Sequence, residues 1–246
     1  MSGLPASFPV QAPPLPGRPR MAQQWRDLAF LHWPVEPDAV GPLLPPGVEP
    51  DTLGGATYVG LVSLRMSGVG LPVGPAVPYL GTFPETNVRL YSVDPAGRHG
   101  VVFMSLEAGR LLTVLAARVA YRLPYCWARM RYGRQGDVVR YRTRRRWPGP
   151  LGAGGRVAVR VGEPIADPSP LEHFVTARWG LHARRGRHTV WIPNEHRRWP
   201  LHRADLLDLA DDLVAAAGVT VSGPPVSVLW SPGVRATFGA TRRLDG

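Results

Sequence analysis

The chain has 246 residues, of which 44% are hydrophobic, and a formal net charge of +11. A chain of this length and hydrophobic fraction builds one large domain or two small ones, with a substantial core. All 29 basic residues are arginines, because the sequence contains no lysine. Enzymes that form a Schiff base through a lysyl amine are therefore excluded.

The N-terminal segment differs in composition from the rest. The first twenty residues hold six prolines and lack both a basic start and a continuous apolar segment, so they do not resemble a secretory signal. We expect residues 1–22 to form a flexible proline-rich arm and residues 23–246 to form one domain. The single cysteine, Cys126, is expected to be a small buried hydrophobe. With no internal disulfide to form and no signal segment, the chain is expected to be cytoplasmic.

The first half of the domain is predicted to be rich in strands. Residues 23–35 alternate imperfectly between apolar and polar side chains, which favours a strand, and Pro37 suits the first turn of a short helix. A second strand is expected at residues 56–68. After a loop rich in proline and glycine, residues 86–93 and 100–108 are typical of two strands joined by the turn DPAGRH.

Residues 110–122 are apolar nearly all round and contain no glycine or proline. This pattern predicts a helix packed inside the fold. The longest apolar run, residues 111–117, is much shorter than the roughly 20 residues that a membrane helix requires, so no membrane-spanning segment is expected. The helix runs directly into RLPYCWARM, residues 122–130, which would place Tyr125 near the interior.

The second half is expected to alternate strands with helices. Strands are predicted at residues 125–133, 137–147 and 156–162, followed by a helix that Ser169, Pro170 and Glu172 begin as cap, first residue and capping-box glutamate. Another helix is predicted at residues 204–217, closed by Gly218, and two strands follow at residues 224–232 and 233–241. The fold class is therefore α+β, mainly antiparallel β, with two or three helices and a closed or nearly closed sheet. A closed sheet provides an internal site for one small ligand.

Several motifs that carry chemistry are absent from the sequence. No pair among the seven histidines has the helical i, i+4 spacing, and there is no HExxH or paired-cysteine pattern, so no metal site is expected. The sequence also lacks GxGxxG opening a helix, GxxxxGK[ST] and GxSxG. We therefore expect no nucleotide cofactor and no serine nucleophile.

One group of polar residues has strand spacing. Glu85, Asn87 and Arg89 alternate along a predicted strand, so their side chains share one face. A carboxylate, an amide and a guanidinium on one face either satisfy one another or hold a polar ligand. The spacing alone favours the internal salt-bridge network over the ligand site.

Arginine clusters occur at residues 142–146, 184–188 and 196–198. Such clusters favour anionic partners and include nucleic acid among the candidates. A solvated surface is the favoured interpretation, because aromatic and basic residues do not alternate there as a groove that stacks bases requires.

Three segments carry a resemblance to a known family. They are WRDLAFLHWPVEPDAVGPLLPPGVEPD, FPETNVRLY and ARVAYRLPYCWARM. Together they resemble the uncharacterised YqjF-like family, which is related to the acetoacetate decarboxylase-like superfamily. The resemblance covers about residues 23–234 and implies a cone-shaped, mainly antiparallel β-barrel with an internal cavity for a small oxo-acid.

The resemblance also implies site residues. Arg26 stands at the position of an arginine that helps the substrate carboxylate in the decarboxylases, and Glu85 matches a cavity glutamate. The decarboxylase turn carries two adjacent lysines after an aromatic residue and a proline, whereas residues 123–126 here are LPYC. Gly60 replaces a second cavity glutamate. The anion-binding part of the resemblance is kept and the nucleophile is lost.

Three functional hypotheses follow. The first is a protein that binds a small carboxylate or carbonyl compound in an internal cavity, without Schiff-base chemistry. The second is a lyase, hydratase or isomerase that uses acid/base chemistry in the same cavity, with Glu85 and Tyr125 as catalytic candidates. The third is an arginine-rich surface that binds nucleic acid or an acidic partner. The oligomeric state is left open. The expected ligand-binding residues are Arg26, Glu85, Asn87, Arg89 and Tyr125.

Two of these side chains admit more than one role. Tyr125 can donate a hydrogen bond to a ligand, or act as a general acid if nearby arginines lower its pKa from about 10. It can equally anchor the turn to a backbone carbonyl. Glu85, if buried in a cavity, would have a raised pKa and could serve as acid or base.

Overall fold

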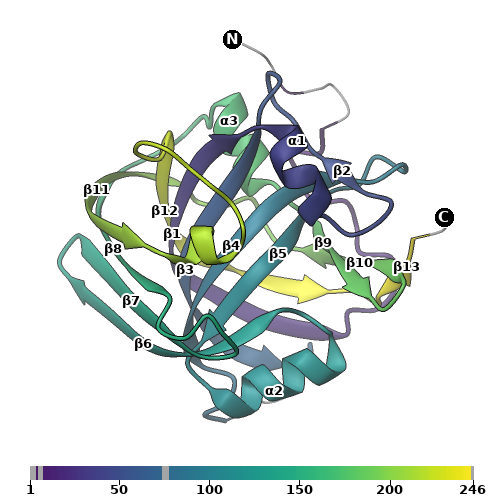
Figure 1. Ribbon diagram of the computed structural model, residues 1–246, viewed down its shortest axis with the longest axis horizontal. Helices are drawn as coiled ribbons and strands as arrows, with labels where there is room; N and C mark the ends of the chain where they lie inside the picture. Colours follow the sequence, from purple (N-terminus) through teal and green to yellow (C-terminus); the bar gives the residue numbers. More distant parts are fainter. Residues whose placement is uncertain (1–3, 5–7, 74–77, 245–246) are drawn as a thin grey trace.

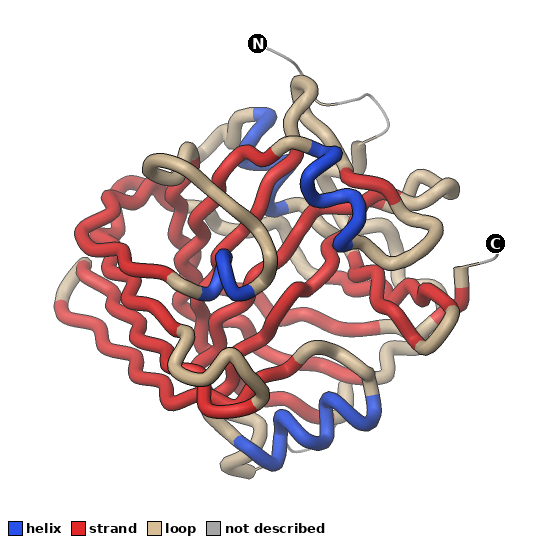
Figure 2. The backbone as a smooth tube through the Cα atoms, in the orientation of Figure 1, coloured by secondary structure: helices blue, strands red, loops and turns tan. Residues whose placement is uncertain are grey.

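The computed structural model describes residue 4 and residues 8–73 and 78–244. Figure 1 shows long strands crossing the molecule, with α3 (Pro170–Thr176) at its upper edge and α2 (Leu111–Ala120) at its lower edge. Strands dominate the chain and the helices are short (Figure 2).

The strands of the described residues form a single sheet. Their bounds are β1 Met21–Val35, β2 Glu49–Pro50, β3 Thr57–Gly70, β4 Phe83–Val93, β5 His99–Ala108, β6 Tyr125–Gln135, β7 Val138–Trp147, β8 Gly154–Pro164, β9 Gly180–Arg185, β10 His188–Glu195, β11 His202–Asp211, β12 Ser227–Phe238 and β13 Arg242–Arg243. The remaining helical segments are α1 Pro37–Val40, the 3-10 turn η1 Gly41–Leu43 and α4 Leu213–Ala216.

The sheet is mixed and mostly antiparallel, which confirms the α+β class. Only the pairings of β5 with β6 and β5 with β9 are parallel among the described strands. The strand order is β13-β10-β9-β5-β6-β7-β8-β11-β12-β1-β3-β4-β2, with further pairings of β10 with β12 and of β5 with β4. Following paired neighbours from β5 leads back to β5 by two routes. One route passes through β6, β7, β8 and β11, and the other passes through β9 and β10. Both routes share the five strands β12, β1, β3, β4 and β5.

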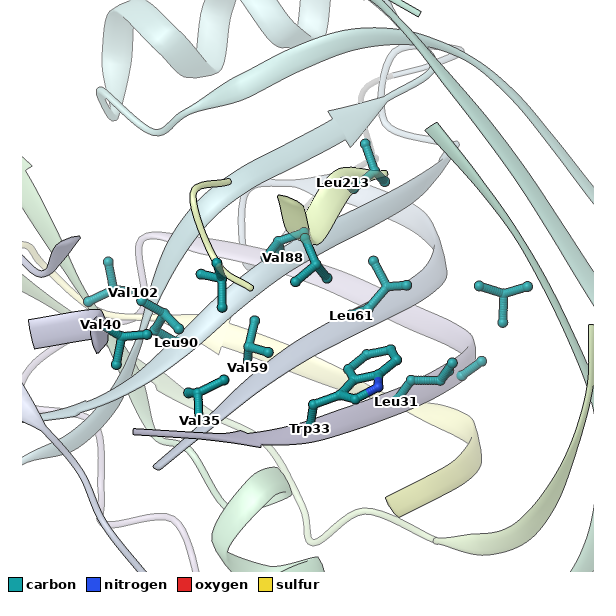
Figure 3. Packing of buried hydrophobic residues seen from close by; sticks show 14 of the residues in the cluster. Leu31, Trp33, Val35, Val40, Val59, Leu61, Val88, Leu90, Val102 and Leu213 are labelled. Atoms are coloured by element: carbon teal, nitrogen blue, oxygen red, sulfur yellow. The ribbon is translucent and has the colours of Figure 1, made fainter. Parts of the chain in front are cut away.

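The shared strands are buried on both faces. On β4, Val88 and Leu90 point into one apolar cluster together with Leu31 and Leu61 of the neighbouring strands; Figure 3 shows this packing. On the opposite face of the same strands, Phe30 belongs to a second cluster. Because both faces are covered, these strands have long apolar runs, which explains why the alternation of residues 23–35 is imperfect.

Most of the predicted elements are confirmed. The strand at residues 23–35 corresponds to β1, Pro37 begins α1, and β4 and β5 form the expected antiparallel hairpin. The Ser169 hydroxyl accepts a hydrogen bond from the Glu172 amide, and the Glu172 carboxylate accepts one from the Ser169 amide. This capping box begins α3 as predicted.

The helix predicted at residues 110–122 is present, but it does not pack inside the fold. Of the residues of α2, only Val114 is buried. Leu112 is 62% exposed and Val119 is 82% exposed. The apolar pattern on all sides of α2 therefore did not predict its burial. The helix lies at the edge of the molecule, and only one of its sides contacts the rest of the protein.

The helix predicted at residues 204–217 is wrong over most of its length. Residues 202–211 form β11, which pairs with β8, and only residues 213–216 are helical. The pairing brings Asp205 opposite Arg160 and places Asp208 within 3.2 Å of Arg156. Pairing with a neighbouring strand that supplies opposite charges outweighs the helical preference of this segment.

The two strands predicted at the end of the chain are one strand, β12. It continues through Gly233, whose φ is +115°. Any larger residue at this position would collide with the Trp25 carbonyl. Glycine allows this close approach, so the strand bends without ending.

Part of residues 8–20 contacts the domain. Residues 1–3 and 5–7 of the expected flexible arm lie outside the described residues, and its flexibility stays a prediction. Phe8 is 5% exposed and packs beside Phe174 of α3, with ring centroids 5.9 Å apart. The Trp179 indole donates a hydrogen bond to the Pro9 carbonyl. Within the described residues, no helix is long and apolar enough to cross a membrane.

Candidate functional site

A cavity of about 360 Å³ lies on the side of the shared strands that faces β9 and β10. Side chains from β1, β3, β4, β5, β9, β10 and α2 line it, and most of them are apolar. A concave, mostly apolar space of this size with a few polar groups is typical of a small-molecule site. The polar groups fall into two centres.

The three polar residues of β4 line this cavity together, as their spacing predicts. Glu85, Asn87 and Arg89 all face it, whereas the alternate residues Val88 and Leu90 belong to the core on the other side. The internal salt bridge that the spacing favoured is not formed, since no ion pair joins Glu85 and Arg89 in the described part of the chain.

The first polar centre is the Glu85 carboxyl. The Tyr125 hydroxyl donates a hydrogen bond to its Oε2 atom at 3.0 Å, and the Asn87 amide donates to Oε1 at 3.3 Å. Burial raises the pKa of Glu85 to about 7, although both hydrogen bonds favour the ionised form. The carboxyl can therefore exchange a proton near neutral pH.

Tyr125 has an electrostatic environment opposite to the one that general-acid catalysis would need. Burial raises its pKa well above 10, and the neighbouring Glu85 raises it further. The expectation that arginines could lower this pKa is not met. Tyr125 is a hydrogen-bond donor that orients the Glu85 carboxyl, and it does not anchor its turn to a backbone carbonyl through the hydroxyl. Its neighbour Cys126 is buried, and burial raises the thiol pKa to about 11.

The second polar centre lies at the inner end of the cavity and carries positive charge. The Arg89 guanidinium donates to the Tyr91 hydroxyl at 3.2 Å and to the Val175 carbonyl at 3.0 Å. It has no carboxylate partner within the residues that the structure describes. Neither contact neutralises its charge, so the positive charge of Arg89 is available to a ligand.

Arg178 reinforces this inner centre. Its side chain is almost fully buried, pairs with Asp51, and donates from Nε to the Phe174 carbonyl at 2.7 Å. Its Nη2 atom is buried with no hydrogen-bond partner in the described residues. A buried guanidinium nitrogen without a partner is costly to leave unsatisfied, so a ligand acceptor at this place would stabilise the protein.

Other cavity residues show the same incomplete bonding. The Oδ1 atoms of Asn87 and Asn194 are buried and lack a partner among the described residues. His196 donates from Nδ1 to the Arg197 carbonyl at 2.7 Å, and burial lowers its pKa to about 4. A neutral imidazole with its proton on Nδ1 leaves Nε2 as an acceptor.

Arg26 is placed away from the cavity. Its side chain is exposed and is not part of the cavity lining. A register shift between β1 and β3 begins at this residue, and Asp27 has a φ of +49°. This bulge redirects the strand, which spacing from a family motif does not predict. The structure therefore brings Glu85, Asn87, Arg89 and Tyr125 together and leaves Arg26 outside.

Gly60 does not line the cavity either. A Cβ atom there would lie 3.1 Å from both the His32 ring and the Tyr91 hydroxyl. These two side chains form a buried hydrogen bond of 2.7 Å. Because they fill the space beside Gly60, a glutamate at this position would have no room.

Sequence reasoning missed Arg178, Asn194 and His196. Arg178 and Asn194 come from segments that are distant along the chain from β4. Arg178 lies over the Tyr91 ring of β4 just after α3, and Asn194 belongs to β10, which pairs with β12. One signal was present: Arg178 is a single arginine within the apolar segment FVTARW, outside the exposed clusters. A lone arginine in such a segment indicates a buried charge that requires a partner.

The arrangement of this chain is similar to that of several solved structures. An acetoacetate decarboxylase from Legionella pneumophila aligns with a TM-score of 0.63 at 12% identity, covering 98% of this chain and 93% of that one. The enduracididine biosynthesis enzyme MppR, complexed with pyruvate, aligns with a TM-score of 0.59 at 14% identity, over 100% and 99% of the two chains. At these identities the likeness establishes the fold, which is acetoacetate decarboxylase-like.

The sequence comparisons identify the family. The model of the DUF2071 family, described as an uncharacterized conserved protein, matches residues 22–235. The uncharacterized protein YqjF of Bacillus subtilis (strain 168) is 30% identical over 203 residues, which cover 82% of this chain and 83% of YqjF. The chain belongs to the DUF2071, or YqjF-like, family, and the resemblance seen in its motifs is confirmed.

Proposed function

We propose that this protein binds a small organic acid, or a carbonyl compound that carries a carboxylate, in the cavity on the β9 and β10 side. One observation carries the proposal: Arg89 has no anionic partner in the described residues, and it lies at the same inner end as Arg178, whose Nη2 atom is unsatisfied. A guanidinium matches a carboxylate in geometry and charge. The closed strand pairings support the cone-shaped barrel that the resemblance implies, with this cavity as its site.

The chemistry available to the protein excludes the covalent route of the decarboxylases. No lysine exists in the chain, so a bound carbonyl cannot form an iminium with a side chain. Hydrogen bonding and charge are the means that remain. MppR, whose fold is similar, has been solved with pyruvate, which supports a carboxylate as the occupant of a cavity in this fold.

Binding can be measured by thermal shift and calorimetry with butanoate, pyruvate and 4-oxopentanoate at fixed salt. A ligand at 100 times its dissociation constant adds about 2.7 kcal/mol of stability, which raises the melting temperature by a few degrees. Arg89→Gln should remove most of this shift. Arg26→Ala is the matched control, because this exposed arginine lies outside the cavity and its loss should leave binding unchanged.

Two results would contradict the proposal. If none of the acids shifted the wild-type protein, the cavity would not be a carboxylate site. If Arg26→Ala and Arg89→Gln weakened binding equally, the acids would be attracted by general positive charge and not by the cavity.

A second candidate function is proton transfer at a carbon next to a carbonyl, with Glu85 as the base. The pKa of Glu85, about 7, favours it, because a base is most effective when its pKa is near the working pH. Glu85 would remove the proton and leave an enolate, which regains a proton from the same carboxyl. Tyr125 would act by orienting Glu85.

Exchange of the protons beside the butanone carbonyl for deuterium, followed by NMR, tests this second function, because a ketone without a carboxylate is not held at Arg89, roughly 13 Å from Glu85 along β4. The exchange rate should rise with pH and level off above about pH 7, as Glu85 ionises. Glu85→Gln should abolish the exchange and Tyr125→Phe should reduce it. Catalysed exchange that survives in Glu85→Gln would exclude Glu85 as the base.

A third candidate is binding of a polyanion such as nucleic acid by the exposed face of β6, β7 and β8. On this face Arg142 of β7 has an arginine opposite it on each neighbouring strand, Arg131 on β6 and Arg156 on β8. Binding by such a surface should weaken with log affinity falling by about 0.9 per duplex phosphate neutralised per log unit of salt. An affinity that does not change between low and moderate salt would exclude this role.

A further inference from the structure

We propose that the natural ligand is an elongated, medium-chain acid. Its carboxylate binds at the inner end of the cavity, at Arg89 and Arg178, and its hydrocarbon chain extends past Glu85 and Tyr125 to α2. The inference rests on the proposed function and names the class of acid that the cavity selects. It follows from the distance between the two polar centres, the apolar wall between them and the position of α2.

The two polar centres are far apart along β4. Glu85 and Arg89 are four residues apart, so their Cα atoms are separated by roughly 13 Å at a rise of about 3.3 Å per residue. The Arg89 guanidinium contacts the Tyr91 hydroxyl and the Val175 carbonyl, and lies 5.6 Å from the Phe30 ring centroid. An acid as short as pyruvate can occupy one centre but cannot span both.

The two centres belong to opposite ends of the molecule. Carbonyl groups of α3 fix the inner centre, since Val175 accepts from Arg89 and Phe174 accepts from Arg178. Tyr125, which holds Glu85, immediately follows α2 and its turn. Figure 1 places α3 and α2 at opposite edges. The cavity therefore has a long axis that runs from α3 toward α2.

Apolar side chains line the cavity along this axis. Val62 and Leu64 of β3 and Phe103 and Leu106 of β5 flank β4 on its two sides, and all of them line the cavity. Such a wall gives a methylene chain a favourable environment, and Asn87, the polar residue of β4 between the two centres, carries no charge. The ligand that fits is charged at one end and apolar beyond it.

Helix α2 forms the outer end of the cavity. Leu112, Ala116 and Ala120 line the cavity and are also exposed, whereas Arg178 at the inner end is 4% exposed. Arg89 is partly exposed, so the lining is most exposed at the apolar helix and most buried at Arg178. The small alanine side chains of α2 leave space where the hydrocarbon chain of the ligand would emerge. A role in contacting this chain would explain why the helix is apolar although it is not packed inside the fold.

A series of unbranched acids tests the inference: acetate, butanoate, octanoate, dodecanoate and tetradecanoate, measured by calorimetry at fixed pH and salt. Each added methylene contributes about 0.8 kcal/mol when buried, which corresponds to roughly fourfold in affinity. Affinity should increase by about this factor with each added methylene from butanoate to dodecanoate, and level off once the chain reaches solvent beyond α2.

A pair of variants on one helix locates the chain. Ala117→Phe places a large side chain on the cavity face of α2 and should weaken dodecanoate binding at least tenfold while acetate and butanoate binding stay within about twofold. Val119→Phe is the control: Val119 is on the same helix, is 82% exposed and does not line the cavity. It should leave the whole series unchanged.

The outcomes separate this inference from the proposed function. If short acids bind through Arg89 and affinity does not increase with chain length, the proposed function stands and the elongated ligand is wrong. If affinity increases with length but Ala117→Phe and Val119→Phe behave alike, the chain does not reach α2 and the inference is also wrong. If no acid binds at any length, both proposals fail.

Discussion

For Glu85, the sequence predicts the direction of the pKa shift but not its size. The sequence places it on one strand face with Asn87 and Arg89, and the structure keeps that face toward the cavity. The pKa of about 7 comes from burial and from the nearby Glu107 carboxylate on β5, working against two hydrogen bonds. Only tertiary contacts decide this balance, because Tyr125 lies forty residues away along the chain.

The raised pKa of Glu85 makes stability depend on pH. The folded protein holds the proton up to pH about 7, whereas the unfolded chain releases it near the ordinary value of 4.5. The stability that protonated Glu85 contributes is therefore present at low pH and is lost as pH rises from about 4.5 to about 7. Above that range the loss amounts to roughly 3 kcal/mol.

Glu85→Gln should remove this dependence. We expect the variant to melt at a higher temperature than the wild type at pH 8, with a difference that shrinks toward pH 5. Thermal unfolding across this pH range measures it. A constant difference between the two proteins would show that Glu85 has an ordinary pKa.

At the scale of elements, the arginine cluster of residues 142–146 is explained by strand alternation on β7. Arg142, Arg144 and Arg146 are exposed, whereas Arg145 turns inward. Arg145 is 5% exposed and pairs with the fully buried Glu107 of β5. The sequence could not separate this buried ion pair from the surface charge, because Glu107 comes from a different strand and the pairing depends on the sheet closing.

The exposed arginines of β6, β7 and β8 face one another directly, which is unfavourable at low salt. Replacing Arg142, which has Arg131 and Arg156 as its cross-strand partners, relieves both repulsions. We expect Arg142→Thr to stabilise the fold by roughly 0.5–1 kcal/mol at low ionic strength, with the gain fading as salt screens the charges.

Denaturant unfolding at several salt concentrations checks this effect. Arg184→Thr is the control, because Arg184 pairs with the uncharged Thr189 and its replacement should give little salt-dependent gain. A gain for Arg142→Thr that is independent of salt would mean that the repulsion is not its cause.

At the scale of the whole molecule, the N-terminal residues complete the core beside the inner end of the cavity. Phe8 packs on Phe174 and His99, and the Arg178 guanidinium lies 5.1 Å from the Phe8 ring centroid. The proline-rich composition that predicts a flexible arm gives no sign of which apolar residue of the segment is buried. The arm therefore supports the arginine that we assign to ligand binding.

Phe8→Ala should destabilise the protein by about 3 kcal/mol, the loss typical of removing a buried aromatic side chain. It should also weaken butanoate binding, because Arg178 loses one of its packing partners. Gln11→Ala, at an exposed position of the same segment, should change neither property. An unchanged melting temperature in Phe8→Ala would show that the arm does not contribute to the fold in solution.

The sequence by itself determined the family, the mainly antiparallel fold class, most strands, the capping box of α3 and the absence of any lysine side chain. These features depend on local pattern or composition, which the chain carries wherever it folds. The tertiary structure decided that residues 202–211 pair as a strand and that α2 covers one end of the cavity. It also placed Arg26 outside the cavity and Arg178 on the cavity wall, because burial and charge pairing arise between segments that no local pattern connects.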